Sequence, residues 1–225
     1  RLGSNVLSVA VSPDGTKAAF ITGKRAMQIW SLTNARPLTA SIALQGEVND
    51  LSFSPDSQRL VTSCKDSVYT ELYAEVWDAV SGRHLSPRLK HKDGVLMSRF
   101  SPDGRLIATA SEDGTAGLWD ATTGALVVPL LEHNYQVQCI AFSPDGRSVA
   151  TASSDTTARV WDVSTGEPLT PPLTHAGPVR FVAFGHDGQI LITRSAQGLF
   201  LWNLAKDNRP LADLVELAEL LNSQQ

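Results

Sequence analysis

The sequence predicts an all-β protein built from one repeated unit, and three observations support this prediction. The turn Ser-Pro-Asp-Gly stands at positions 12–15, 101–104 and 143–146, with the related turns Ser-Pro-Asp-Ser at 54–57 and Gly-His-Asp-Gly at 185–188. Tryptophans follow these turns at positions 30, 77, 119, 161 and 202, so successive tryptophans are 47, 42, 42 and 41 residues apart. The segments between turns alternate apolar and polar residues with period two, which is typical of strands. A fixed period of this length indicates a repeat architecture.

Each repeat unit is expected to contain four short strands. In the fourth unit they cover residues 136–142, 148–152, 157–161 and 168–173. The Pro-Asp-Gly turns predict hairpins between antiparallel strands, because proline presets the first turn angle, aspartate bonds its own backbone and glycine accepts positive φ. The units begin near residues 6, 47, 94, 136 and 178 and form one domain over residues 1–207.

Residues 208–225 depart from this pattern and predict a C-terminal amphipathic helix with a polar tail. Its apolar residues share one face at i, i+3 and i+4 spacing: Leu211, Leu214, Val215, Ala218 and Leu221. Its acidic residues lie towards the other face: Asp213, Glu216 and Glu219. We expect the apolar face to pack on the last repeat unit, and the alternative is that it docks a further domain.

In its SPDG turns, its Ser-x-Asp turns and its closing Trp-Asp pairs, the chain resembles the WD-repeat (WD-40) family over about residues 6–203. The resemblance implies a β-propeller in which each repeat forms one four-stranded blade. Five blades are present, and seven or eight are usual in the family, so we expect at least two further blades before Arg1. Residues 165–179 are most similar to propellers of large bacterial multidomain signalling proteins.

The resemblance also implies a structural quartet of His, Ser or Thr, Asp and Trp that fastens each blade through hydrogen bonds. The third repeat supplies His91, Thr109, Asp113 and Trp119, and the fourth supplies His133, Thr151, Asp155 and Trp161. Histidines at positions 91, 133 and 175 are equivalent in the repeat, which favours a structural role over metal binding or catalysis.

The remaining quartets are incomplete. The second repeat keeps Thr62, Asp66 and Trp77 but has no histidine among residues 44–46. The fifth keeps His175, Thr193 and Trp202 but has Ser195-Ala196 in place of the aspartate. The second turn of the first repeat also lacks its aspartate. We therefore expect the first and fifth blades to be looser than the others.

Composition narrows the range of partners. A net charge of -4 and a pI near 5.7 give no electrostatic reason to expect nucleic acid or an anionic membrane as a partner. Cys64 and Cys139 belong to no CxxC motif or cysteine framework, so we expect neither a disulfide scaffold nor a zinc site. A reducing compartment, the cytoplasm, fits best, and we expect no metal and no cofactor.

The sequence does not favour an enzyme. A hydrolytic propeller needs paired carboxylates that converge on its central channel, and only the second innermost strand offers acids, namely Glu47 and Asp50. The chain has no phosphate-binding glycine-rich loop with a lysine and no GxSxG motif. A channel-based hydrolase therefore stays only the least favoured alternative.

The resemblance implies a non-catalytic scaffold for protein–protein interaction, whose partners bind to exposed loops. The alternative is a regulatory or targeting tail of a bacterial signalling enzyme, such as a Ser/Thr protein kinase, with the catalytic domain outside this segment. The basic stretch at residues 83–92 is interpreted as charge on an outermost strand that discourages edge pairing. The partner proteins themselves are unknown.

A candidate partner-binding patch comes from five surplus residues within 67–75 of the second repeat. Long loops are more often functional than structural, and aromatic side chains are favoured interface anchors. Loops at the starts of the fourth and fifth innermost strands are expected on the same propeller face. The candidate residues are Tyr69, Glu71, Tyr73, Tyr135 and Arg180.

Overall fold

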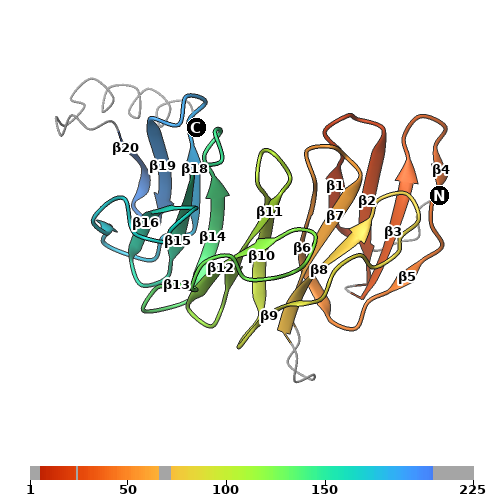
Figure 1. Ribbon diagram of the computed structural model, residues 1–225, viewed down its shortest axis with the longest axis horizontal. Helices are drawn as coiled ribbons and strands as arrows, with labels where there is room; N and C mark the ends of the chain where they lie inside the picture. The colour runs from red at the N-terminus through yellow and green to blue at the C-terminus, as the bar shows by residue number, and fades with distance from the viewer. Residues whose placement is uncertain (1–5, 24, 66–71, 205–225) are drawn as a thin grey trace.

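The computed structural model describes residues 6–23, 25–65 and 72–204, and within these ranges all helix or strand structure is β-strand. The described strands form five antiparallel sheets that follow one another along the chain (Figure 1). The predicted all-β class and the five repeat units are therefore confirmed. No helix in the described ranges is long and apolar enough to cross a membrane. The predicted C-terminal helix lies outside the described residues.

Blades 1 and 2 are the two sheets nearest the N-terminus, numbered in chain order. Blade 1 contains β1 (Val6–Val11), β2 (Lys17–Thr22), β3 (Ala26–Ser31), β4 (Arg36–Pro37) and β5 (Ile42–Ala43). Blade 2 contains β6 (Glu47–Phe53), β7 (Arg59–Lys65), β8 (Leu72–Asp78) and β9 (Leu89–His91). In blade 1, both β4 and β5 pair with β3, so its outermost strand is split in two.

Blades 3 and 4 have four strands like blade 2, and blade 5 has three described strands. Blade 3 contains β10 (Val95–Phe100), β11 (Leu106–Ser111), β12 (Thr115–Asp120) and β13 (Leu131–Glu132). Blade 4 contains β14 (Val137–Phe142), β15 (Ser148–Ser153), β16 (Thr157–Asp162) and β17 (Leu173–Thr174). Blade 5 contains β18 (Phe181–Phe184), β19 (Ile190–Ser195) and β20 (Gly198–Asn203). The fourth strand expected at residues 168–173 is shorter than predicted, because only a bridge from Trp161 to Pro168 precedes β17.

The repeated turns have the backbone that their sequence predicts. Gly104 and Gly146 adopt φ of 71°, the left-handed region that glycine enters without a steric penalty. Ser57 occupies the same turn position in blade 2 at φ of 60°, which costs a residue with a Cβ some strain. The Ser57 side chain also accepts a hydrogen bond from the backbone of Asp14 in blade 1, which a glycine could not do.

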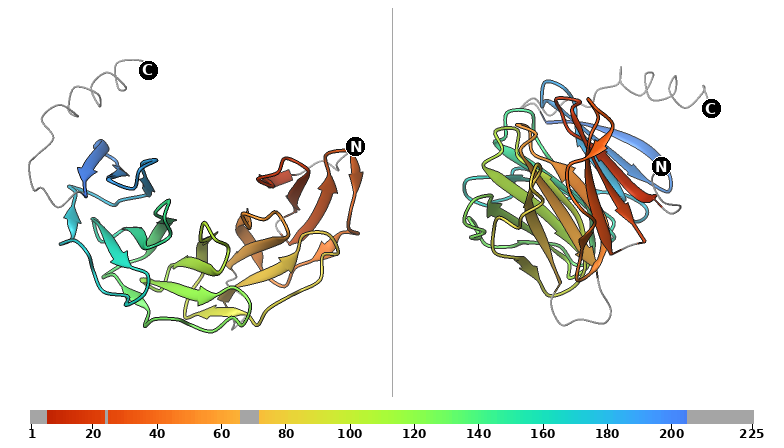
Figure 2. Two further views of the ribbon diagram at one scale, coloured as in Figure 1. Left: turned by 45° about the horizontal axis from the view of Figure 1, so that its top comes forward. Right: turned by 90° about the vertical axis from the view of Figure 1, so that its right-hand side faces the viewer.

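The blades lie side by side in an open arc, with β1 at one end and β18–β20 at the other (Figure 2). The first strands of successive blades contact one another, so they are the innermost strands of the arc. Each hydrophobic cluster joins two neighbouring blades; one, for example, brings Ile29 of blade 1 against Leu60 of blade 2. The core is therefore distributed between blades rather than gathered in one centre.

The open arc leaves the outer face of blade 1 uncovered. Val9 and Val11 in β1 are 55% and 57% exposed, whereas the equivalent residues of β6, Leu51 and Phe53, are 5% and 7% exposed against blade 1. The repeat thus places apolar side chains at the same positions in both blades, and only in blade 2 does a preceding blade cover them.

Candidate functional site

The fourth-blade quartet forms a continuous chain of hydrogen bonds that joins β15, β16, the turn between them and the residue after β13. The indole Nε1–H of Trp161 donates to Thr151 Oγ1 at 2.8 Å, and Thr151 Oγ1 lies 2.7 Å from Nε2 of His133. His133 Nδ1 lies 2.9 Å from Asp155 Oδ2, which also accepts from the backbone N–H of Asn134 at 3.0 Å. His133 lies directly after β13, the outermost strand of blade 3, so the quartet fastens that strand to blade 4.

The proton positions in this chain follow from the donor inventory. An ionised Asp155 can only accept, so the single ring proton of the neutral His133 is on Nδ1, where it donates to Asp155. Nε2 of His133 is then an acceptor, and the Thr151 hydroxyl, which accepts from Trp161, donates its hydrogen to it. Burial lowers the pKa of His133 and keeps it neutral, with the nearby Asp155 partly opposing that effect. All four polar groups are satisfied with a neutral histidine.

Asp155 remains ionised within this buried network. Burial alone would raise its pKa, but hydrogen bonds from the Thr157 hydroxyl, His133 and the Asn134 backbone lower the pKa to about 2. The side chains of His133 and Asp155 are only 0% and 5% exposed. This geometry leaves no reactive group accessible to a substrate, so it supports the structural role that the sequence indicated.

The third-blade quartet has the same geometry. Thr109 Oγ1 accepts from Trp119 Nε1 at 2.8 Å and lies 2.7 Å from His91 Nε2, and His91 Nδ1 lies 3.1 Å from Asp113 Oδ2. Burial opposes ionisation of Asp113, but hydrogen bonds from His91, Thr115 and the Lys92 backbone hold its pKa well below the ordinary value.

Blade 5 keeps three members of the quartet. Thr193 Oγ1 accepts from Trp202 Nε1 and lies near His175 Nε2, both at 2.8 Å. Because the aspartate is missing, His175 Nδ1 instead contacts the backbone carbonyl of Leu173, at 3.0 Å. A backbone acceptor replaces a charged one, and burial lowers the pKa of His175.

Blade 2 is fastened by an arginine where the sequence has no histidine. Arg88 Nε donates to the buried Glu75 at 3.0 Å, and Arg88 Nη2 donates to Gln45 at 2.7 Å. The guanidinium also lies 4.1 Å from the centre of the Tyr73 ring. These four residues, which we call the arginine staple, were not predicted. The basic stretch at residues 83–92 therefore includes a residue, Arg88, that is engaged inside the blade.

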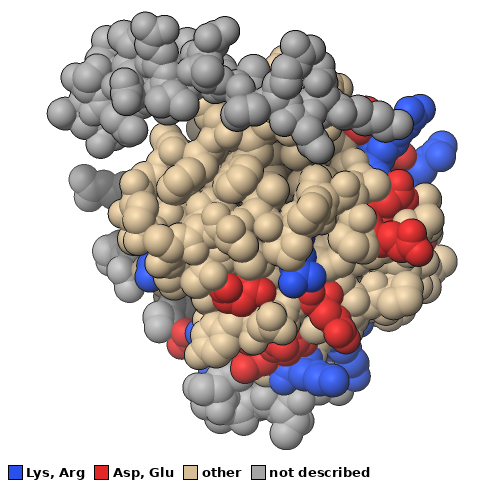
Figure 3. Space-filling model, turned by 90° about the vertical axis from the view of Figure 1, so that its left-hand side faces the viewer, with Lys and Arg blue, Asp and Glu red and all other residues tan. Residues whose placement is uncertain are grey.

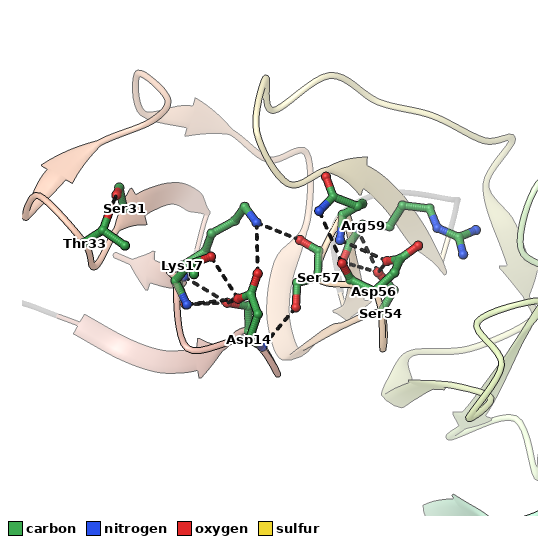
Figure 4. A network of polar contacts seen from close by, with 11 residues as sticks. Asp14, Lys17, Ser31, Thr33, Ser54, Asp56, Ser57 and Arg59 are labelled. Atoms are coloured by element: carbon green, nitrogen blue, oxygen red, sulfur yellow. Dashed lines mark hydrogen bonds and ion pairs between the residues drawn. The ribbon is translucent and has the colours of Figure 1, made fainter.

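The SPDG turns also link neighbouring blades, a role that sequence reasoning did not assign to them. Lys17 Nζ donates to the carbonyl of Ser57 at 3.1 Å, and the backbone N–H of Asp14 donates to Ser57 Oγ at 3.2 Å (Figure 4). Arg59 Nη2 donates in the same way to the carbonyl of Gly104 in the next turn, at 2.6 Å. A cation at the start of the second strand, five residues after the turn serine, is the sequence signal for this link.

Of the two candidate channel acids, Asp50 is paired with an arginine of the next blade. Asp50 Oδ2 accepts from Arg99 Nη1 and from the backbone N–H of Ser98, so its charge is used between blades 2 and 3. A shallow cavity of about 310 Å³ lies along β10, β14 and β18, and among the described residues Arg99 is the one charged side chain in its lining. Within the described ranges, no group of three or more His, Cys, Asp or Glu residues is placed to hold a metal ion.

The structure divides the predicted partner-binding patch. Tyr73 lies inside β8, only 3% exposed and covered by Arg88, so its prediction as a contact residue is wrong. The reason is that residues 72–75, taken as part of a surplus loop, belong to the strand. Tyr69 and Glu71 lie outside the described residues.

Two residues of the patch, Tyr135 and Arg180, belong to loops that lie near each other. Tyr135 is 59% exposed, and its carbonyl accepts from Ser153 Oγ at 2.9 Å. Arg180 is also exposed, and the residue before it, Val179, donates its backbone N–H to the carbonyl of Ser153 at 3.0 Å. Ser153, the last residue of β15, thus holds both loops at the same end of blades 4 and 5.

Comparison with known proteins agrees with the repeat structure. The family model described as "WD domain, G-beta repeat" matches residues 38–68, 85–120 and 124–162. The chain therefore contains WD40 repeats. Its five described antiparallel sheets are consistent with WD40 propeller blades.

The curated relatives match only part of their own length. "Serine-threonine kinase receptor-associated protein" of Rattus norvegicus and of Homo sapiens are each 32% identical over 111 residues, which is 49% of this chain and 30% of the relative. An uncharacterized WD repeat-containing protein of Schizosaccharomyces pombe is 32% identical over 73 residues, 32% of this chain and 17% of that protein. The matched regions thus cover less than a third of these relatives.

A solved structure shares the fold. The computationally designed Ika8 protein superposes with a TM-score of 0.77 at 21% identity, covering 91% of this chain and 60% of that protein. At this identity the likeness concerns the fold alone.

Proposed function

We propose that this protein is a non-catalytic scaffold that holds a protein partner on the exposed loops of its blades. The WD40 repeats indicate an interaction scaffold. The observation that carries the proposal is that the quartet histidines and aspartates are buried and hydrogen-bonded to one another, as in His133 and Asp155. They stiffen the blades, and binding is left to the residues on the surface.

The binding surface that we propose includes Tyr135 and Arg180. A tyrosine and an arginine are the side-chain types that most often anchor protein interfaces. The hydrogen bonds at Ser153 hold their backbones in place, so little conformational entropy is lost when a partner binds.

The experiment that tests this function is affinity capture with the full 225-residue chain as bait, followed by mass spectrometry. The double variant Tyr135→Ala/Arg180→Glu is the comparison bait, and Arg36→Glu, at an exposed position of blade 1, is the matched control. We expect a partner that the chain and the control capture and that the double variant captures at least about tenfold less, roughly 1.4 kcal/mol. Equal capture by all three baits would refute this surface.

The proposal also places the protein in the cytoplasm, in keeping with two cysteines, Cys64 and Cys139, that are buried and form no disulfide. The regulatory tail of a signalling enzyme stays the second prediction. Its support is limited to the resemblance of residues 165–179 to bacterial signalling propellers. The sequence of the gene on either side of this segment tests it, because a kinase catalytic domain in the same reading frame would favour the tail.

A further inference from the structure

A cation joins the first turns of neighbouring blades, the turns between the first and second strands. In blade 1, Lys17 donates to the Ser57 carbonyl of blade 2, and its Nζ lies 3.7 Å from Asp14 Oδ2 of its own turn (Figure 4). The Lys17 side chain is only 11% exposed, so it fills the space between the two turns. Arg59 takes the same position in blade 2 and donates to the Gly104 carbonyl of blade 3. Each link thus joins a cation to a carbonyl of the next blade.

The residue at this position changes along the chain. Counted from the first residue of the turn, the sixth residue is Lys17 in blade 1, Arg59 in blade 2, Leu106 in blade 3 and Ser148 in blade 4. A leucine has nearly the bulk of the alkyl part of a lysine side chain, but a serine has neither that bulk nor the charge. The contact between blades 4 and 5 therefore lacks both parts of the link.

The first turns nevertheless pack against one another in the same way at this contact. A Cβ placed on Gly104 would lie 3.6 Å from Cδ of Pro55 in the preceding blade. At Gly188 the corresponding distance, to Pro144 Cδ, is 3.5 Å. The Gly188 carbonyl therefore has the setting in which the Gly104 carbonyl accepts from Arg59. Among the described residues, no hydrogen bond reaches the Gly188 carbonyl.

A cavity of about 230 Å³ lies at the contact between blades 4 and 5. Its lining includes Ser148, Gly188 and Asp145, which correspond to the cation, the carbonyl and the carboxylate of the blade 1 link. Thr170 also lines the cavity, and its hydroxyl oxygen is buried without a hydrogen-bond partner among the described residues. Buried polar atoms are almost always hydrogen-bonded, so this hydroxyl indicates a bound group that supplies the partner.

The charge of the lining favours a cation. Asp145 and Asp187 are exposed, and the described residues of the lining include no Lys, Arg or His. Asp145 accepts from the Ser143 hydroxyl and from the Arg147 backbone N–H, both through Oδ1, which leaves Oδ2 for a cation. These bonds hold the pKa of Asp145 below its ordinary value, so the carboxylate is ionised at neutral pH.

The rest of the lining favours an alkyl chain. Val160, Leu169, Phe184 and Leu204 line the cavity. Apolar side chains of this kind cover the methylene groups of a lysine while its charged end reaches a polar group. On the side of the molecule where β20 lies, the middle of the surface has few charged side chains, and charges gather towards the lower and right-hand edges of the view (Figure 3). That surface therefore offers a cation little attraction compared with the two turn aspartates.

We propose that the cavity between the first turns of blades 4 and 5 binds the alkylammonium group of a lysine side chain from a partner protein. The ammonium takes the place that Lys17 Nζ has in blade 1. It donates to the Gly188 carbonyl and pairs with Asp145, and its alkyl chain lies against Leu169 and Phe184. The partner's lysine thus supplies the link that Ser148 does not form.

This site is separate from the proposed binding surface at Tyr135 and Arg180. Ser148 is the first residue of β15, and Ser153, which holds the loops of that surface, is the last. The two sites therefore lie at opposite ends of one strand, and the failure of one has no bearing on the other.

Titration of the isotope-labelled 225-residue chain, followed through its backbone amide NMR signals, tests the site. The probe is acetyl-lysine methylamide, and acetyl-norleucine methylamide is the control compound without the ammonium. We expect saturable shifts of the Gly188 and Thr170 amides with the lysine compound only. Asp145→Asn should weaken this binding about threefold, the size expected for an ion pair open to solvent. Asp103→Asn, at the equivalent turn position of blade 3, should leave it unchanged.

A lysine built into the chain gives a second readout. Ser148→Lys should unfold at a higher urea concentration than Ser148→Met, which has a similar length but no charge. Adding Asp145→Asn to both variants should reduce the difference between them. Ser148→Lys should also no longer bind the lysine compound, because its own ammonium occupies the site.

Several results would overturn the proposal. Equal shifts with both compounds would assign the cavity to apolar ligands, and the lack of any saturable shift would show that it binds neither. Displacement of the lysine compound by calcium at constant ionic strength would assign the cavity to a metal ion. Binding of putrescine at least about tenfold tighter than the lysine compound, roughly 1.4 kcal/mol, would assign it to a free diamine. A Ser148→Lys variant no more stable than Ser148→Met would show that an ammonium does not fit between these turns.

Discussion

Thr151 is the residue through which the fourth-blade quartet is connected. It accepts from Trp161 and donates to His133, so Thr151→Val removes both hydrogen bonds with little change of volume. The variant leaves two buried groups without partners, and we expect a loss of about 2 to 4 kcal/mol in the free energy of unfolding. Chemical denaturation midpoints measure it, with the exposed Thr165→Val as the control. A loss no larger than the control's would show that the quartet does not stabilise the blade.

The same quartet predicts how stability depends on pH. The folded-state pKa of His133 is below its usual 6.5, so the unfolded chain binds more protons and stability falls as the pH drops below about 6.5. The folded-state pKa of Asp155 is about 2 against the usual 3.8, so its contribution is present above about pH 4 and is lost as the pH falls towards 2. Both effects have the same sign, and the contribution of Asp155 amounts to about 2 kcal/mol.

Urea denaturation between about pH 7 and pH 3 measures this dependence. The unmodified chain should lose stability throughout, and Asp155→Asn should lose less between about pH 4 and pH 3 than the unmodified chain does. Identical slopes for the two proteins in that range would contradict the assignment of Asp155.

At the residue scale, the sequence repeat locates side chains that recur at equivalent positions of several blades. It does not locate side chains that occur in one blade alone. His133 and Asp155 were found because their spacing to Trp161 recurs in the neighbouring repeat. Tyr73 was misplaced because a length comparison locates surplus residues only within a range, and it cannot tell the loop from the first residues of β8.

At the element scale, blade 2 shows that a blade can be fastened without the histidine. The variant Arg88→Met keeps much of the contact with Tyr73 but removes the guanidinium from the buried Glu75, which keeps only the imidazole of His84 at 3.6 Å. Because the arginine is partly exposed, we expect a loss of about 2 to 3 kcal/mol rather than the larger cost of a fully buried pair. Thermal unfolding measures the loss.

The matched control for this prediction is Arg83→Met, at a less buried position in the preceding turn. The double variant Arg88→Met/Glu75→Met should recover most of the stability, since it removes the unpaired charge together with its partner. A double variant less stable than Arg88→Met would show that the ion pair between Arg88 and Glu75 is not the reason why Arg88 stabilises blade 2.

The sequence predicted the strands well because turn chemistry and period-two alternation are local signals. The innermost strands expected near residues 47, 94 and 136 begin at Glu47, Val95 and Val137. The arginine staple and the link from Lys17 to Ser57 were not predicted, because they join residues of different elements in single copies or in two repeats only. Such contacts depend on how blades pack, which local patterns do not contain.

At the scale of the whole molecule, the open arc exposes apolar positions that another blade covers elsewhere. Val9→Lys should change the free energy of unfolding by no more than about 0.5 kcal/mol, because the side chain is already in solvent. Leu51→Lys, at the equivalent but covered position of blade 2, should cost at least about 3 kcal/mol, since it buries a charge.

Denaturation midpoints of the two lysine variants check this contrast, and light scattering should show less self-association for Val9→Lys than for the unmodified chain. A large loss of stability in Val9→Lys would mean that the face of β1 is covered in solution.

The central claim is that buried quartets stiffen this protein while exposed loop residues bind its partner. One measurement tests it most directly, namely quantitative capture of the identified partner by Tyr135→Ala/Arg180→Glu and by Thr62→Val, with the unfolding midpoint recorded for each sample. Thr62→Val removes the buried hydrogen bond from Trp77 Nε1 in blade 2, away from the loops at Tyr135 and Arg180. We predict that the surface variant loses at least about tenfold in capture with an unchanged midpoint. Thr62→Val should shift the midpoint and, at temperatures where it remains folded, capture the partner at full strength. Full capture by the surface variant, or loss of capture by folded Thr62→Val, would contradict the account.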